Sequence, residues 1–174
     1  MAMTNLEQRA KEFAERHHAA VNQVRKYTGE PYIVHPAAVV EIVRNVPHTP
    51  EMLAAAWLHD TVEDTNATAQ EVLHAFSPAV ALLVEMLTDV SRPADGNRAI
   101  RKSLDLKHTA LASPDAQTIK LADIIDNSRC ILAHDPDFAK VYLREMTALL
   151  GVMKSGNPHL HQIAAEQLRV GIAQ

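Results

Sequence analysis

The chain contains a single cysteine, Cys130, among its 174 residues. One cysteine cannot form an internal disulfide, and it cannot supply the thiolates of a cysteine-rich zinc site. Only five glycines are present, and no stretch shows the alternation of β-branched residues between turns that is typical of hairpins. Aromatic residues make up only 4% of the chain, so a core must be built mainly from alanine, leucine, isoleucine and valine. These scarcities argue against a disulfide-bonded scaffold and against a β-sheet protein.

Long apolar runs and a surplus of positive charge are also missing. No segment approaches the length that spans a membrane, and no apolar stretch at the N-terminus resembles a signal peptide. The formal net charge is -4, which does not favour a general DNA- or RNA-binding protein. We therefore expect a cytoplasmic protein without a DNA, RNA or membrane partner, and an oligomer stays open.

Signals for the start of a helix recur along the chain, and they indicate an all-α fold. A capping side chain followed by proline suits the first helical turn, and this pair occurs at residues 49–50, 77–78, 113–114, 135–136 and 157–158. The spacing of apolar residues predicts a first amphipathic helix from about Asn5 to Val24, and Pro36 marks the start of a second. The length fits one domain, so we predict a single helical domain over residues 1–174.

His35, His59, Asp60 and Asp123 are polar residues in stretches that otherwise look apolar and helical. The His-Asp pair lies in the apolar run 54–62, where an unpaired charge would be costly to bury. Two imidazoles and two carboxylates together suit a divalent transition metal that keeps positions open for water. The sequence therefore predicts a metal site between helices. Taken alone, His35 is more often a cap or core residue, and Asp123 could pair with a cation from another helix.

Two further acidic residues follow the His-Asp pair. On one continuous helix through residues 54–65, His59, Asp60, Glu63 and Asp64 would lie within an arc of about 140°. Glu63 and Asp64 would then lie on an exposed flank beyond the ligands, where they could orient a water molecule or accept its proton. The alternative is a helix end whose acidic residues only reach solvent.

Three stretches of the chain are similar to the motifs of a known superfamily. They are residues 25–36 (RKYTGEPYIVHP), 54–65 (AAAWLHDTVEDT) and 120–127 (KLADIIDN). Their order resembles the H…HD…D pattern of HD-domain metal-dependent phosphohydrolases. The Glu-Asp pair after His-Asp resembles the hydrolase domain of RelA/SpoT-type proteins and the small alarmone hydrolases, which include the metazoan SpoT homologues. The resemblance runs from the first helix to about residue 160.

This resemblance implies a helical HD-domain bundle with a bound metal. By motif position, Mn²⁺ or another divalent transition metal would be held by His35, His59, Asp60 and Asp123. The implied reaction is 3′-pyrophosphohydrolysis of a nucleotide alarmone (ppGpp, pppGpp or ppApp), in which Glu63 and Asp64 act in catalysis. The implied substrate contacts are Arg25, Lys26, Asn127 and Tyr142. As bare features, the two cations could equally be a solvated helix end and the tyrosine a core residue.

Three positions depart from the family pattern. Ala20 stands where the family usually has a histidine, and Ile124 stands where an arginine or lysine usually follows the aspartate. Phe138 stands where the metazoan-type hydrolases offer an arginine near the phosphates. Fewer cations are then available for a polyphosphate, and two alternatives stay open. One is another HD phosphatase that removes a 2′- or 3′-phosphate from NADPH or a nucleotide, and the other is a nucleotide-binding regulator without turnover.

Overall fold

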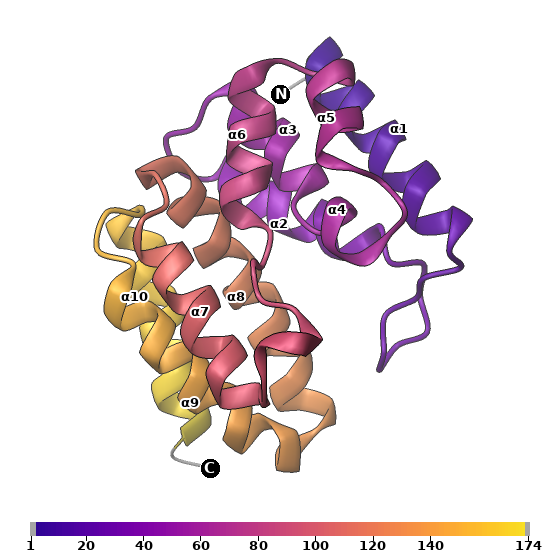
Figure 1. The fold of residues 1–174 in the computed structure, drawn as a ribbon. Coiled ribbons are helices and arrows are strands. Elements are labelled where there is room, and N and C mark those ends of the chain that lie inside the picture. Colours follow the sequence, from indigo (N-terminus) through magenta and orange to yellow (C-terminus); the bar gives the residue numbers. More distant parts are fainter. Residues whose placement is uncertain (1–2, 173–174) are drawn as a thin grey trace. The chain divides into compact units, whose positions relative to one another are not determined.

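The computed structural model describes residues 3–172, and its regular elements within that range are helices (Figure 1). The described residues contain no β-strand, only an isolated antiparallel bridge between Val24 and Pro31. The predicted all-α fold is therefore confirmed. None of the helices within residues 3–172 is both long enough and apolar enough to cross a membrane.

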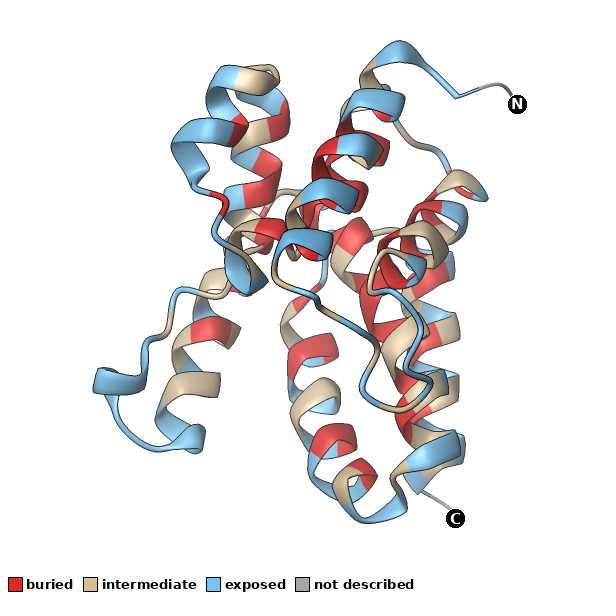
Figure 2. Cartoon of the chain, turned by 90° about the vertical axis from the view of Figure 1, so that its right-hand side faces the viewer, coloured by how far each residue is buried: buried red, intermediate tan, exposed pale blue. Residues whose placement is uncertain are grey.

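The first of two compact units ends at Thr88 and is organised around one buried helix. In α3 (Pro50–Leu58) every residue from Met52 onward is buried. Three helices pack against α3: α1 (Asn5–Ala20), α2 (Val34–Arg44) and α6 (Pro78–Leu87). The short helices α4 (Thr61–Asp64) and α5 (Ala69–Ala75) complete the unit. Figure 2 shows buried positions along one side of most helices and exposed positions along the other.

A buried ion pair ties three of these helices together. Glu7 of α1 is fully buried, and its carboxylate pairs with the guanidinium of Arg44 from α2. The indole nitrogen of Trp57 in α3 donates to the same carboxylate oxygen at 3.4 Å. Because a buried carboxylate without a partner is strongly destabilising, this pair fixes α1 and α2 against α3.

The second unit begins at Asp89 and has a long central helix, α8 (Pro114–His134). α9 (Pro136–Val152) and α10 (Pro158–Ile172) pack against α8, and α7 (Arg98–Ala110) packs against α9. A short 3-10 helix, η1 (Pro93–Asp95), precedes α7. The prediction of a single domain over residues 1–174 depends on how the two units associate, so it stays a prediction.

The capping signals place the helix starts correctly, but one predicted helix end is wrong. The side chains of Thr49, Ser77, Ser113 and Asp135 each accept from a backbone N–H in the first turn of the helix that follows. α1 ends at Ala20 rather than near Val24. Asn22 has a φ of 52°, in the left-handed region that asparagine tolerates, and this conformation ends the helix. α2 begins two residues before Pro36.

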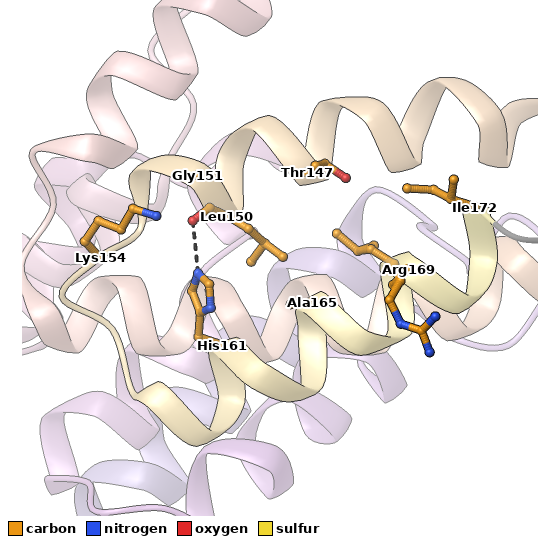
Figure 3. A pocket seen from close by; sticks show the side chains of 9 residues that line it. Thr147, Leu150, Gly151, Lys154, His161, Ala165, Arg169 and Ile172 are labelled. Atoms are coloured by element: carbon orange, nitrogen blue, oxygen red, sulfur yellow. Dashed lines mark hydrogen bonds between the residues drawn. The ribbon is translucent and has the colours of Figure 1, made fainter.

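A cavity of about 350 Å³ lies between α9 and α10 of the second unit (Figure 3). Its wall is mainly apolar. Nε2 of His161 is hydrogen bonded to the carbonyl oxygen of Leu150 at 3.0 Å, and the guanidinium of Arg169 is paired with Glu166. No carboxylate is among the lining residues, so this cavity does not offer the predicted metal chemistry.

Candidate metal centre

His35, His59 and Asp60 come from three neighbouring elements of the first unit. His35 lies in the first turn of α2, His59 directly follows α3, and Asp60 directly precedes α4. The prediction of one continuous helix through residues 54–65 is therefore wrong, because a turn separates α3 from α4. Asp60 has φ -100° and ψ -3°, away from regular helical values. The turn brings its carboxylate back toward the two imidazoles.

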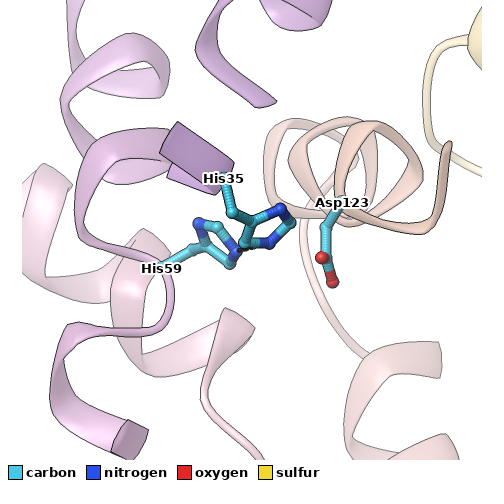
Figure 4. A group of neighbouring side chains, drawn as sticks. All are labelled: His35, His59 and Asp123. Carbon is cyan, nitrogen blue, oxygen red and sulfur yellow. Dashed lines mark hydrogen bonds between the residues drawn. The ribbon is translucent and has the colours of Figure 1, made fainter. Parts of the chain in front are cut away.

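Three ligand atoms of these residues form a small triangle, which we call the ligand triangle. Nε2 of His35 and Nε2 of His59 are 3.3 Å apart. Oδ2 of Asp60 lies 3.5 Å from the first nitrogen and 3.1 Å from the second. The two rings meet edge to face with their centroids 5.1 Å apart (Figure 4). Both histidines are buried, and the Asp60 side chain is 16% exposed.

The size of the ligand triangle fits one divalent transition metal. Metal–ligand bonds of about 2.1 Å place neighbouring ligand atoms about 3.0 Å apart in an octahedron and about 3.4 Å apart in a tetrahedron. Two of the observed separations, 3.1 and 3.3 Å, lie within this range, and the third, 3.5 Å, is just above it. Imidazole nitrogen with carboxylate oxygen is also a donor set that such metals accept.

The protonation of His59 supports the same conclusion. Its Nδ1 lies 2.8 Å from the carbonyl oxygen of Ala56, which can only accept, so Nδ1 carries the proton. When this ring is neutral, its Nε2 offers a lone pair within the ligand triangle, where the carboxylate of Asp60 also points. Lone pairs gathered in this way repel one another and are stabilised by a cation among them. The local chemistry therefore agrees with a metal site.

Tyr32 contacts the candidate site through a hydrogen bond that the sequence did not predict. Its hydroxyl donates to Oδ2 of Asp60 at 2.5 Å, and its ring lies 5.7 Å from the ring of His35, measured between centroids. Its place three residues before His35 in the same motif was the available signal, but the hydrogen bond spans 28 residues and has no local signature.

Glu63 and Asp64 are both exposed at the end of the short helix α4. Oδ2 of Asp64 accepts a hydrogen bond from Nε2 of Gln23 at 2.8 Å. Partial burial of the Asp64 carboxyl group, and then the negative charge of Asp60, raise its pKa, although the residue keeps contact with solvent. A carboxylate with a raised pKa is a better proton acceptor than an ordinary one.

Asp123, the remaining predicted ligand, belongs to the second unit and lies in the middle of α8. Figure 4 draws it together with the two histidines, and all three are buried and carry atoms that could ligate a metal. Nδ2 of Asn127 donates to Oδ1 of Asp123 at 2.6 Å, and Nζ of Lys120 lies 2.9 Å from Oδ2. The cation that pairs with Asp123 thus comes from its own helix. Because Asp123 is in the other unit, its participation in the metal site stays a prediction.

The four predicted substrate contacts divide between the units. In the first unit, Arg25 and Lys26 lie in a loop closed by backbone hydrogen bonds from Arg25 to Glu30 (2.8 Å) and from Gly29 to Arg25 (2.9 Å). Gly29 has a φ of 71°, which favours glycine there. This loop leads directly into Tyr32 and the start of α2, so the two cations and His35 are carried by one segment.

In the second unit, Asn127 contacts Asp123 and Tyr142 is buried in α9. The hydroxyl of Ser128 lies 3.5 Å from the hydroxyl of Tyr142. Burial, and then the negative charge of Asp123, raise the pKa of the Tyr142 phenol, so it stays protonated at neutral pH. Contacts of either residue with a substrate stay predictions.

Comparison with known proteins gives the chain a family. A family model described as HD domain matches residues 10–149. The guanosine-3′,5′-bis(diphosphate) 3′-pyrophosphohydrolase of Aquifex aeolicus is 36% identical over 124 residues, which are 71% of this chain and 17% of that protein. A probable GTP pyrophosphokinase of Mycobacterium leprae is 36% identical over 137 residues, which are 78% of this chain and 17% of that protein. The chain therefore spans about a sixth of the length of these curated relatives.

A solved structure is similar along almost the whole chain. It is that of a metazoan orthologue of SpoT, described as hydrolysing ppGpp. Its TM-score is 0.85 at 28% sequence identity, and the match covers 98% of this chain and 97% of that one. Since the HD-domain model also covers well over half of the sequence, this chain belongs to the HD-domain family.

Proposed function

We propose that this chain is a divalent-metal-dependent phosphohydrolase that releases pyrophosphate from the 3′ position of guanosine or adenosine alarmones such as ppGpp. The observation that carries the proposal is the ligand triangle of His35, His59 and Asp60, with edges of 3.1, 3.3 and 3.5 Å. The substrate class is supported by two relatives, the Aquifex aeolicus protein and the metazoan SpoT orthologue, whose names and descriptions state that chemistry.

The metal, which we propose to be Mn²⁺, would be held by His35, His59, Asp60 and Asp123. When bound, a metal of this kind supplies a Lewis acid that polarises a phosphoryl oxygen and lowers the pKa of water. Hydrogen bonds to the far side of a metal-ligating side chain fix its orientation and tautomer before the metal binds. For His59 this partner is the carbonyl oxygen of Ala56, and for Asp123 the partners are Lys120 and Asn127.

Asp64 and Glu63 would orient the attacking water and accept its proton. Water attacks the phosphorus that is bonded to the 3′ oxygen, and the O3′–P bond breaks. Pyrophosphate is released, and the 3′ oxygen of the nucleotide takes up a proton to become a hydroxyl group. The raised pKa of Asp64 suits a group that takes a proton from water near neutral pH. Both residues are exposed, so water and substrate can reach them. No covalent nucleophile is required.

A substrate with several phosphates also needs cations from the protein. Arg25 and Lys26 are the proposed partners, because they lie in the loop that leads into the ligand triangle. A guanidinium can bond a phosphate with its donors while its flat face stacks on a base. Asn127 and Tyr142 of the second unit are proposed as further contacts of the nucleotide.

A second candidate is removal of a single 2′- or 3′-phosphate from NADPH or a nucleotide. It is favoured by the uncharged residues at two positions, 124 and 138, where related proteins carry cations. Ile124 is only 1% exposed and fills the core of the second unit. Phe138 lies under the guanidinium of Arg98, 5.6 Å from its ring centroid, and that arginine is already paired with Glu145. A substrate with fewer phosphates would need fewer cations.

Product analysis separates the two candidates. The purified chain is incubated with ppGpp, ppApp and NADPH, with and without Mn²⁺, and pyrophosphate and orthophosphate are measured separately. We expect Mn²⁺-dependent release of pyrophosphate from at least one alarmone. Release of orthophosphate alone would support the second candidate, and no turnover of any alarmone by metal-loaded protein would reject the proposed function.

A further inference from the structure

A chain of two hydrogen bonds connects a buried histidine with the proposed proton acceptor. Nδ1 of His18, in the last turn of α1, lies 2.7 Å from Oε1 of Gln23. Nε2 of Gln23 donates to Oδ2 of Asp64 at 2.8 Å. His18 is 1% exposed, whereas Asp64 is exposed to solvent. The array therefore runs from the interior of the first unit to its surface.

The backbone around Gln23 fixes the middle of this array. The N–H of Gln23 donates to the carbonyl of His18, and its own carbonyl accepts from the N–H of Tyr32, both at 3.1 Å. The left-handed conformation of Asn22, with a φ of 52°, turns the chain back over the end of α1. Both the backbone and the side chain of Gln23 are thus held, so its amide has a defined position relative to Asp64.

The direction of each hydrogen bond follows from the carboxylate at the end. An ionised Asp64 can only accept, so Gln23 presents its amide nitrogen to Asp64 and its oxygen to His18. That oxygen can only accept, so His18 carries its proton on Nδ1. Nε2 of His18 is then unprotonated, and it has no hydrogen-bond partner among the described residues. Burial also lowers the pKa of His18, which keeps the ring neutral.

We propose that Gln23 and His18 are positioning residues for Asp64. Gln23 fixes the rotation of the Asp64 carboxylate, and His18 fixes the amide of Gln23 in the orientation that donates to it. This inference rests on the proposed function, because the role of Asp64 in the reaction is itself proposed. Tyr32 connects the array to the ligand triangle, since its ring lies 4.8 Å from that of His18 and its hydroxyl donates to Asp60.

Steady-state kinetics of matched variants in the Mn²⁺-loaded full chain test the role. Gln23→Leu keeps the approximate size of the side chain and removes both of its hydrogen bonds. We expect kcat for pyrophosphate release to fall about 10- to 100-fold, as for other residues that orient a reacting group, with KM and bound metal nearly unchanged. Gln8→Leu is the control, because the amide of Gln8 on α1 donates to the exposed Glu12 side chain at 2.7 Å, on the surface of the helix.

Two variants of His18 separate orientation from packing. His18→Leu should lower kcat in the same way as Gln23→Leu. In His18→Asn, the amide nitrogen can donate from nearly the position of Nδ1, so most of the rate should return. A His18→Asn variant as slow as His18→Leu would show that the hydrogen bond to Gln23 does not matter, and it would overturn the inference.

A spectroscopic readout tests the array without any turnover. Long-range ¹H–¹⁵N correlation of the imidazoles, recorded on the full chain without paramagnetic Mn²⁺, should show the Nδ1–H tautomer of His18 at pH 7. An Nε2–H tautomer or an imidazolium would overturn the inference, as would a Gln23→Leu variant with wild-type kcat. A wild-type protein that releases no pyrophosphate would instead reject the proposed function, and with it the role of the array. The two failures are therefore distinguishable.

Discussion

Replacement of His59 by alanine should abolish the stabilisation of this protein by Mn²⁺. Nε2 of His59 makes the two shortest separations of the ligand triangle, 3.1 Å to Oδ2 of Asp60 and 3.3 Å to Nε2 of His35. Since a metal that binds only the folded chain stabilises it by mass action, Mn²⁺ at a hundred times its dissociation constant should contribute about 2.7 kcal/mol to the wild type. At about 2–4 °C per kcal/mol for a chain of this size, Tm should rise by roughly 5–11 °C.

The assay compares thermal unfolding with and without Mn²⁺ after treatment with a chelator. The change in Tm on metal addition is the quantity compared, because His59→Ala also alters packing and lowers the Tm of the metal-free protein. His74→Ala is the matched control: Nδ1 of this exposed histidine also lies near a carbonyl oxygen of its own helix, 2.9 Å from Gln70. We expect the control to keep the full shift and His59→Ala to lose nearly all of it. A full shift in His59→Ala, or none in the wild type, would refute the ligand triangle as a metal site.

Three further outcomes follow from other parts of the molecule. Glu63→Gln should keep the Mn²⁺-induced rise in Tm and lose about 100-fold or more in kcat, and a normal rate of pyrophosphate release would remove Glu63 from the chemistry. Arg25→Ala should raise KM about tenfold with little change in kcat, since it removes a contact made in ground and transition state alike, and an unchanged KM would count against its role. Arg44→Met should lower the free energy of unfolding by about 3–5 kcal/mol in denaturant titrations, because Glu7 stays buried without its cation. Arg169→Met, whose pair is exposed, should have almost no effect, and equal losses in both variants would contradict this account.

Local chemistry made the helix starts predictable from the sequence. A capping oxygen and the proline after it act within one turn, so Thr49, Ser77, Ser113 and Asp135 carry the whole signal in adjacent residues. The end of α1 was not predictable in this way. Helical propensity does not forbid continuation through Val24, and the chain leaves the helix because Asn22 adopts a left-handed conformation.

The proposed ligands could also be singled out from the sequence, but their geometry could not. His35, His59 and Asp60 were singled out because polar residues in apolar helical stretches need a partner. The residues at the break between α3 and α4 have only modest helical propensity, but Asp60 makes no side-chain capping hydrogen bond, so no clear local signal marks the break. The hydrogen bond from Tyr32 to Asp60 stabilises that turn across 28 residues, and such long-range contacts leave no periodic signal. The array from His18 through Gln23 to Asp64 was missed for the same reason, because its last bond spans 41 residues.

The left-handed backbone at position 22 limits the amino acids that evolution can place there. Most side chains cost about 1–2 kcal/mol in that conformation, whereas glycine adopts it freely and asparagine tolerates it. Asn22 is neither a proposed metal ligand nor a proposed substrate contact, yet the placement of its neighbour Gln23 depends on it. Sequence drift at this site should therefore be confined to very few amino acids, for a reason of backbone shape and not of reactivity.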